Sequence, residues 1–125
     1  MIENKIGTAV VDIAIQIHKE LGPGLLESVY EIVFAHELTK LGFNIKRQVP
    51  ISITYHGLVF QEGFRADIVI EDKVILELKS VLSLMPVHKK QLLTYLKLSG
   101  CKLGYLLNFN EELMKSGISR VVNGL

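Results

Sequence analysis

Three ionisable side chains interrupt an apolar stretch at residues 64–80, which reads FRADIVIEDKVILELKS. Two short apolar runs separated by Glu-Asp-Lys predict two strands joined by a turn at residues 71–73. Side chains two positions apart on a strand share a face, so Glu77 and Lys79 project the same way, as do Asp67 and Val69. If the strands pair across the turn, Asp67 lies beside Glu77 and Lys79.

Two carboxylates and an ammonium group are costly to bury on a sheet unless they bind something. A divalent metal held by Asp67 and Glu77 would offset their repulsion, and hard oxygen ligands suit Mg²⁺ or Mn²⁺. Lys79 could then orient or help deprotonate a metal-bound water, or neutralise charge on a phosphate. The alternative is an edge strand whose three charged groups form solvated salt bridges, and the spacing alone does not decide between them.

A helix expected over residues 25–41 carries two glutamates on its apolar side. Glu27 and Glu37 fall within that apolar arc, whereas Ser28, Ala35 and Thr39 fall on the polar side. Glu27 therefore needs a cation, a metal or a bound water as its partner. For Glu37 we expect an internal ion pair, with Arg65 as the candidate partner. The arc itself contains Leu26, Val29, Tyr30, Val33, Phe34, Leu38 and Leu41.

A further helix, expected over residues 86–99, places His88, Gln91 and Tyr95 on one inner stripe beside Leu92. A histidine or tyrosine on such a face is usually a core residue with its hydrogen bonds satisfied. Gln91 is more informative, because its amide has four hydrogen-bonding capacities that a core must meet.

Other segments fill out a mixed sheet with helices packed against it, which is an α/β fold. We expect a first helix over residues 4–21, ended by Gly22-Pro23-Gly24. One strand is expected from residue 45 to 55, with a hairpin turn at His56-Gly57 and a return strand from residue 58. A strand at 102–109 and a short last one at 117–122 complete the pattern.

The composition suits one domain spanning residues 1–125. The chain is 49% hydrophobic and has a net charge of +1, so it lacks the basic character of a strong, non-specific nucleic-acid binder. A single cysteine excludes an internal disulfide and a cysteine-based zinc cluster. With no signal peptide pattern and no long uncharged apolar run, we expect a soluble cytoplasmic protein.

The motifs Gly24-Leu-Leu-Glu27-Ser-Val-Tyr30, Asp67, Glu77-Leu78-Lys79 and Gln91-x-x-x-Tyr95 occur in this order in the chain. Over residues 5–123 the sequence resembles the GxxExxY family, which is related to the PD-(D/E)XK nuclease superfamily. The resemblance implies a restriction-endonuclease-like core, with a central mixed β-sheet flanked by α-helices. One departure is Ala66, which stands where the superfamily name has proline.

By this resemblance, Asp67 and Glu77 are catalytic, metal-binding acids, the carbonyl of Leu78 is a further ligand and Lys79 is the catalytic lysine. Glu27 matches a glutamate that several branches add to the site from the preceding helix, and is a further catalytic residue and metal ligand. The sequence does not decide between one metal and two, and Glu27 leaves room for a second. Gln91 and Tyr95 match a signature that supports the site or the nucleic-acid backbone, and Tyr30 and His88 are grouped with them as supporting residues. The implied activity is Mg²⁺- or Mn²⁺-dependent hydrolysis of phosphodiester bonds, with DNA as the commoner substrate.

Two other functions stay open from the sequence. The domain could be a non-catalytic nucleic-acid-binding or protein-interaction module, since no separate DNA-reading element is visible. It could also act on a nucleotide or structured RNA, with Lys46, Arg47, Lys89 and Lys102 as candidates for backbone contact. A nuclease that cuts both strands usually forms a homodimer, and the apolar first helix could supply that interface or be buried within the monomer.

Overall fold

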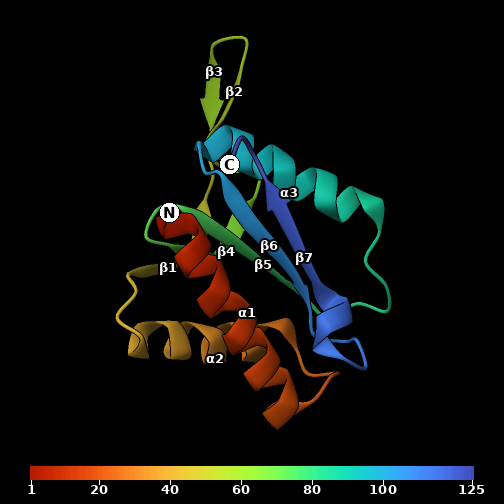
Figure 1. Cartoon of the computed structure of the whole chain (residues 1–125). Coiled ribbons are helices and arrows are strands. Elements are labelled where there is room, and N and C mark those ends of the chain that lie inside the picture. Colours follow the sequence, from red (N-terminus) through yellow and green to blue (C-terminus); the bar gives the residue numbers. More distant parts are fainter.

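The computed structural model describes residues 1–125, which form a five-stranded mixed sheet with helices on both faces (Figure 1). The strand order is β1-β4-β5-β6-β7, and only β5 and β6 run parallel. A parallel pair needs a crossover connection, which α3 provides here. The predicted α/β fold is therefore confirmed. The strands are β1 (Ile45–Pro50), β4 (Arg65–Ile70), β5 (Val74–Lys79), β6 (Leu103–Asn108) and β7 (Ile118–Val122).

Three α-helices form where the periodicity predicts them: α1 (Ile2–Leu21), α2 (Glu27–Lys40) and α3 (Pro86–Ser99). A 3₁₀ helix, η1 (Met114–Gly117), precedes β7. The α1 residues that recur every three or four positions lie in the core of the monomer, namely Ile6, Val10, Ile13, Ala14 and Ile17. Most apolar residues of α1 are thus buried within the monomer, whereas Ile15 is 42% exposed, and a homodimer interface on this helix stays a prediction. None of the three α-helices has the length and the apolar character of a membrane span.

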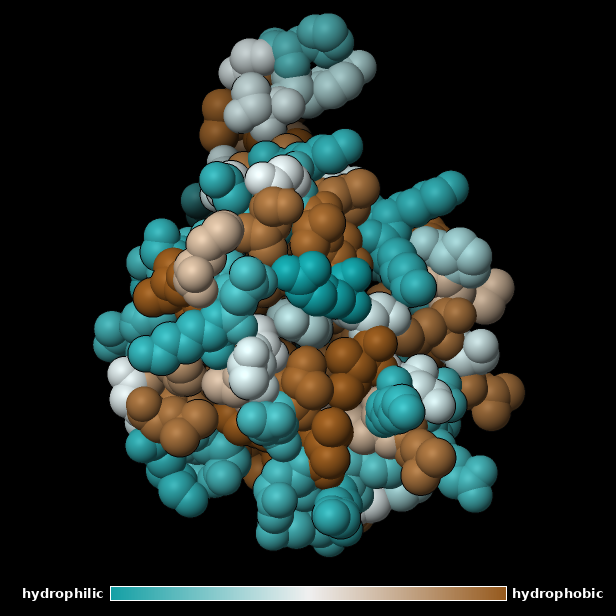
Figure 2. All heavy atoms as spheres, viewed as in Figure 1, coloured by the Kyte–Doolittle hydropathy of each residue, from teal (hydrophilic) through white to brown (hydrophobic).

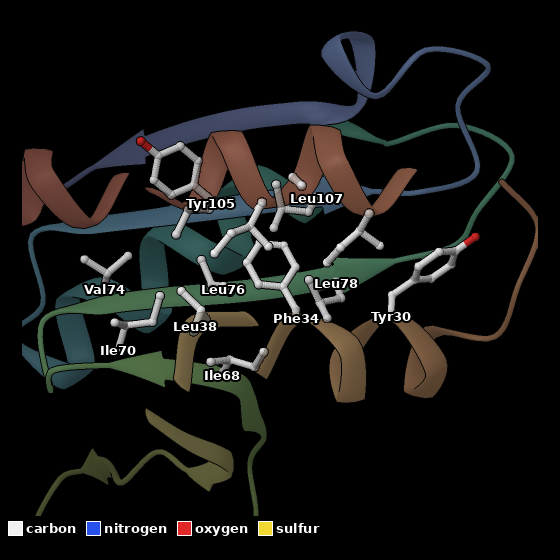
Figure 3. Packing of buried hydrophobic residues seen from close by; sticks show 14 of the residues in the cluster. Tyr30, Phe34, Leu38, Ile68, Ile70, Val74, Leu76, Leu78, Tyr105 and Leu107 are labelled. Carbon is white, nitrogen blue, oxygen red and sulfur yellow. The ribbon is translucent and has the colours of Figure 1, made fainter. Parts of the chain in front are cut away.

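The larger hydrophobic core lies between the sheet and the α1–α2 layer, and contains 19 buried residues. Figure 3 shows Phe34 and Leu38 of α2 facing Ile68 on β4 and Leu76 on β5. Tyr30 extends this layer, because its ring stacks on Phe109 with centroids 4.2 Å apart. This packing fixes α2 against the sheet, and so fixes the position of the acidic residues Glu27 and Glu31 in the first half of that helix.

The opposite face of the sheet is covered by α3. Val69 and Ile75, which pair across β4 and β5, belong to a second cluster of nine buried residues that includes Leu92 and Leu96 of α3. Since alternate strand residues share a face, Asp67, Glu77 and Lys79 lie on the same side as Val69 and Ile75. The charged residues of the hairpin therefore lie on the α3 side of the sheet.

The expectation of one continuous strand over residues 45–55 is wrong. β1 ends at Pro50, which has no N–H to donate, and the chain leaves the sheet after one further backbone bond, from the Ile51 amide to the Phe64 carbonyl at 3.2 Å. Residues further on form a separate two-stranded hairpin of β2 (Ile53–Tyr55) and β3 (Leu58–Phe60). The turn at His56-Gly57 is confirmed: both residues have positive φ, 46° and 86°, as a two-residue hairpin turn of this class requires. The hairpin projects from the body of the molecule (Figures 1 and 2).

Candidate active site

Counted from the turn that joins β4 and β5, the backbone pairing of the two strands ends at Ile68, next to Asp67. Beyond this point the hydrogen bonds between the strands involve side chains. The register ends at the pair Ile68 and Leu76. Beyond it, Asp67 Oδ2 accepts the backbone N–H of Leu78 at 2.7 Å, and Glu77 Oε1 accepts the backbone N–H of Asp67 at 3.2 Å. The predicted juxtaposition of Asp67 and Glu77 is therefore present in the fold, at the point where the two strands separate.

The carbonyl of Leu78 faces the same opening. In a strand, the N–H and C=O of one residue project toward the same neighbouring strand. Since the Leu78 amide is directed to Asp67, its carbonyl is directed to the β4 side as well, whereas the carbonyl of Lys79 accepts the Phe109 amide on the β6 side. Three oxygen donors, from Asp67, Glu77 and the Leu78 backbone, thus belong to one small region.

The positive charge around the carboxylates of Asp67 and Glu77 is too small to offset their burial and mutual repulsion, so the pKa of each is raised. Burial, and next the charge of Asp67, raise the pKa of Glu77 from 4.5 to about 8. Burial is also the main cause that raises the pKa of Asp67, and the charge of Glu31 adds to it, while the Leu78 amide and Lys79 oppose the shift. A hard divalent cation would supply the missing charge, and carboxylate and carbonyl oxygens are the donors that Mg²⁺ and Mn²⁺ prefer. The donor set therefore fits such an ion.

Lys79 lies partly buried beside this pair. It forms no salt bridge, yet its charge lowers the pKa of both Asp67 and Glu77, which places its ammonium group near them. The alternative of three solvated, salt-bridged groups does not describe the structure, since Glu77 is only 7% exposed. An unpaired ammonium next to two acids can contact a substrate phosphate or a water molecule.

Glu27 lies at the rim of the site instead of on the core face of α2. It is the first residue of the helix, it is exposed, and its Oε2 accepts the Ser80 amide at 3.3 Å just after β5. It is still close enough to Glu77 to raise its pKa. No group of three His, Cys, Asp or Glu side chains is close enough to hold a metal, so Glu27 does not complete a three-carboxylate centre.

The predicted apolar arc of α2 is rotated and shortened in the structure. Leu26 is 75% exposed, because the helix begins only at Glu27 and Leu26 precedes it with an extended backbone. Leu41 lies beyond the other end and is also largely exposed. Ala35, expected on the polar side, is buried. The apolar side of this helix is thus set by its packing against Phe109 and the sheet.

The ion pair expected between Glu37 and Arg65 is absent. Glu37 pairs with Lys40, one helical turn away, at 3.3 Å. The internal ion pair of α2 is formed instead by Glu31, which is 6% exposed, and Arg47 of β1 at 2.8 Å.

Tyr30 is a structural residue that shapes the loop before Glu27. Its side chain is fully buried, its hydroxyl donates to the Gly22 carbonyl at 2.6 Å and accepts the Leu25 amide at 3.1 Å. Ser80 Oγ in turn donates to the Leu25 carbonyl at 2.9 Å. The loop between α1 and α2 is therefore tied both to its own helix and to the end of β5.

The three residues predicted to lie on one inner stripe of α3, His88, Gln91 and Tyr95, have different environments in the structure. Tyr95 is buried, stacks on Phe64 with ring centroids 3.2 Å apart, and has its pKa raised to about 12 by burial and the charges of Glu77 and Asp67. His88 Nδ1 accepts the Met85 amide at 2.8 Å and so caps the helix. Gln91 is exposed, and the expectation that it faces inward is wrong. Only Tyr95 lies against the acidic pair.

Three residues near the site were not identified as part of it from the sequence. Gln48 Nε2 donates to Glu31 Oε1 at 2.6 Å and to Asp67 Oδ1 at 3.4 Å, and Arg47 binds the other oxygen of Glu31. One signal was available: Glu31 follows Glu27 by four residues, which puts both on one side of a helix. The contacts of Arg47 and Gln48 with Glu31 depend on the position of β1 relative to α2, which the local sequence pattern does not predict.

The order of an acid on β4 and Glu-x-Lys on β5, on a mixed sheet flanked by helices, agrees with the comparison with protein families. The model of the PD-(D/E)XK nuclease superfamily matches residues 4–121. The chain belongs to this superfamily. No curated protein and no solved structure is significantly similar to it.

Proposed function

We propose that this protein is a metal-dependent nuclease that hydrolyses phosphodiester bonds, with DNA as its substrate and Mg²⁺ or Mn²⁺ as its cofactor. The observation that supports the proposal is the juxtaposition of Asp67 and Glu77 where β4 and β5 separate, with Lys79, which forms no salt bridge, beside them. Strand geometry directs the Leu78 carbonyl to the same side. The superfamily typically uses divalent metals, which agrees with this donor set.

In this proposal Asp67 and Glu77 bind the cation through their carboxylates, and the Leu78 carbonyl adds a neutral oxygen. When bound, the cation supplies positive charge that polarises the scissile phosphate and acidifies water. Lys79 contacts the phosphate or the attacking water and stabilises negative charge that develops during in-line attack. Tyr95 closes one side of the site through its stacking on Phe64, which limits the entry of bulk water.

Glu27 has a supporting role in this account. It holds the Ser80 amide at the end of β5 and adds negative charge near Glu77. The Gly24, Glu27 and Tyr30 motif forms one local unit in the fold, since the Tyr30 hydroxyl fixes the loop that leads into Glu27. This unit supports our narrower proposal that the chain belongs to the GxxExxY family.

The cleavage test uses supercoiled plasmid DNA with Mg²⁺ or Mn²⁺ at millimolar concentration, with wild type, Glu77→Ala and Lys79→Ala purified in the same way. We expect nicking by wild type and none by either variant, with all three folded by circular dichroism. Glu37→Ala is the matched control, because Glu37 pairs only with its helix neighbours Lys40 and His36. Equal cleavage by wild type and both site variants would contradict the proposal. A single-stranded RNA arm in the same assay tests the choice of DNA, and light scattering tests whether the nuclease is a homodimer.

A second candidate is a non-catalytic binding module that keeps the fold of a nuclease. One observation favours it: the structure holds no cluster of three side-chain metal ligands. Calorimetric titration with Mg²⁺ and Mn²⁺ separates the two candidates. Binding that is lost in Glu77→Ala supports the nuclease, whereas no binding by wild type at millimolar metal supports the module.

A further inference from the structure

The carboxamide of Gln48 connects the candidate active site to an ion pair outside it, formed by the buried Glu31 and the exposed Arg47. Gln48 Nε2 lies 2.6 Å from Glu31 Oε1 on α2 and 3.4 Å from Asp67 Oδ1 on β4. An amide nitrogen carries two hydrogens, so it can serve both carboxylates at once. Gln48 therefore joins an acid of the site to an acid that lies on a different element.

The far end of this connection is fixed. Glu31 is 6% exposed, and its Oε2 accepts a hydrogen bond from Nε of Arg47 at 2.8 Å and forms an ion pair with Nη2 of Arg47, also at 2.8 Å. A planar guanidinium that uses two donors on one carboxylate holds it in a defined orientation. Glu31 is buried but the Arg47 side chain is 43% exposed, and an ion pair of this kind is weak evidence for a gain in stability. We therefore consider a positioning role for it.

The backbone at Gln48 is unusual in a way that serves the same contact. Gln48 has φ of 52°, the left-handed region, although it lies within β1. It sits between the paired positions Arg47–Ile68 and Val49–Ala66, and is thus directly opposite Asp67. A non-glycine residue in this region is strained, and such strain at a functional site is a reason to look for a function.

We propose that Gln48 is a positioning residue for Asp67, with Glu31 and Arg47 as its anchor. The inference rests on the proposed function, in which Asp67 binds the cation. Gln48 holds Oδ1 of Asp67 so that Oδ2 accepts the Leu78 amide, and this fixes the carboxylate relative to Glu77. Arg47 pairs with Glu31 and so reduces the negative charge that Glu31 adds beside Asp67 and Glu77. Glu31 acts here as an anchor and does not bind the metal.

Amide hydrogen exchange in the metal-free protein tests this positioning directly. The Leu78 amide reports the Asp67 contact, and the Leu76 amide reports the neighbouring backbone ladder. We compare wild type with Gln48→Met, which keeps the length of the side chain and removes both donors, and with Gln48→Ala. Lys46→Met is the matched control on the same strand, because Lys46 pairs only with Asp72 at 3.0 Å. Gln48 is exposed, so its variants should remain folded.

We expect exchange of the Leu78 amide to be faster by about tenfold in both Gln48 variants, with Leu76 unchanged and with Lys46→Met like wild type. Loss of the anchor in Arg47→Met should give a smaller increase at Leu78. An unchanged Leu78 amide would overturn the proposal, and so would an equal increase at Leu76 and Leu78, which would indicate a general loss of stability.

Calorimetry with Mn²⁺ provides the link to function. Residues that orient a metal ligand typically contribute about tenfold or more to metal affinity, so Gln48→Met should bind Mn²⁺ about tenfold more weakly than wild type and Lys46→Met. Equal affinities would overturn the proposal. If wild type itself bound no Mn²⁺, the proposed function would fail, while the exchange of Leu78 would still decide whether Gln48 positions Asp67.

Discussion

The carboxylate of Asp67 accepts the backbone amide of Leu78 at 2.7 Å, in place of the backbone bond that would continue the β4–β5 ladder. This contact lies where the backbone pairing of β4 and β5 ends, and the Leu78 carbonyl is directed to the same side as its amide. A salt-bridged surface strand would not need it. The contact explains how an apolar hairpin in the middle of a sheet accommodates charged side chains.

Replacement of Lys79 by Met should remove cleavage without removing metal binding. Lys79 forms no salt bridge, so its ammonium group is available to substrate, and its loss should lower the rate by at least about 100-fold. Plasmid cleavage and Mn²⁺ calorimetry measure the two effects. Lys73→Met, in the exposed turn between the strands, is the control. Cleavage by Lys79→Met at the wild-type rate would remove the lysine from the mechanism.

The metal-free protein should lose stability as the pH rises from about 5 to about 8. Burial raises the pKa of Glu77 from 4.5 to about 8 in the folded state, so between these values the folded chain binds a proton that the unfolded chain has released. The stabilisation is complete below the unfolded pKa and is lost as pH rises through the folded pKa, by up to about 1 kcal/mol per pH unit from this group. Asp67 shifts in the same direction.

Thermal melting at a series of pH values measures this dependence. Glu77→Gln stays neutral and should flatten the curve, and Mg²⁺ should raise the melting temperature of wild type most at high pH, where Glu77 is ionised. Glu37→Gln should follow wild type. If Glu77→Gln and wild type had the same pH dependence, the raised pKa of Glu77 would be wrong.

Tyr30→Phe should destabilise the fold although the aromatic ring is kept. The stacking on Phe109 remains, but the Gly22 carbonyl and the Leu25 amide lose their hydroxyl partner. We expect a loss of about 1–3 kcal/mol in the free energy of unfolding, measured with urea. Tyr55→Phe is the control, since Tyr55 is 66% exposed on the projecting hairpin. Equal stability of both variants would remove the structural role of Tyr30.

His88 should act as a helix cap and not as a substrate ligand. Its Nδ1 accepts the Met85 amide at the start of α3, a position at which glutamine can replace it. His88→Ala should cost about 1 kcal/mol in stability, and His88→Gln should restore most of it. Neither variant should change Mn²⁺ affinity. A large loss of cleavage in a stable His88→Gln variant would instead place the imidazole in the chemistry.

The sequence predicted the parts of the site that depend on local periodicity. Asp67, Glu77 and Lys79 share a face because strand side chains alternate, and a short turn at 71–73 leaves only one pairing of the strands. Likewise Pro86 and Gly100 mark the limits of α3, where a proline begins the helix and a glycine with φ of 77° ends it.

The positions that depend on packing were predicted less well. Glu27 is exposed at the first position of α2, which begins one residue after Leu26, the first residue of the apolar arc. Gln91 is exposed because α3 packs on the sheet through Leu92 and Leu96. The Arg47–Glu31 pair joins elements that are adjacent only in the folded chain. Hydrophobic periodicity gives the average orientation of a helix, but which polar residues at its margin are buried depends on tertiary contacts.

The most direct measurement is a crystal structure of the wild-type protein soaked in Mn²⁺, with anomalous scattering data to locate the ion. We expect one anomalous peak about 2.1 Å from oxygens of Asp67, Glu77 and the Leu78 carbonyl, and no such peak in Glu77→Ala crystals treated in the same way. No peak at this position in wild type at millimolar Mn²⁺, or a peak only at other surface carboxylates, would contradict the central claim.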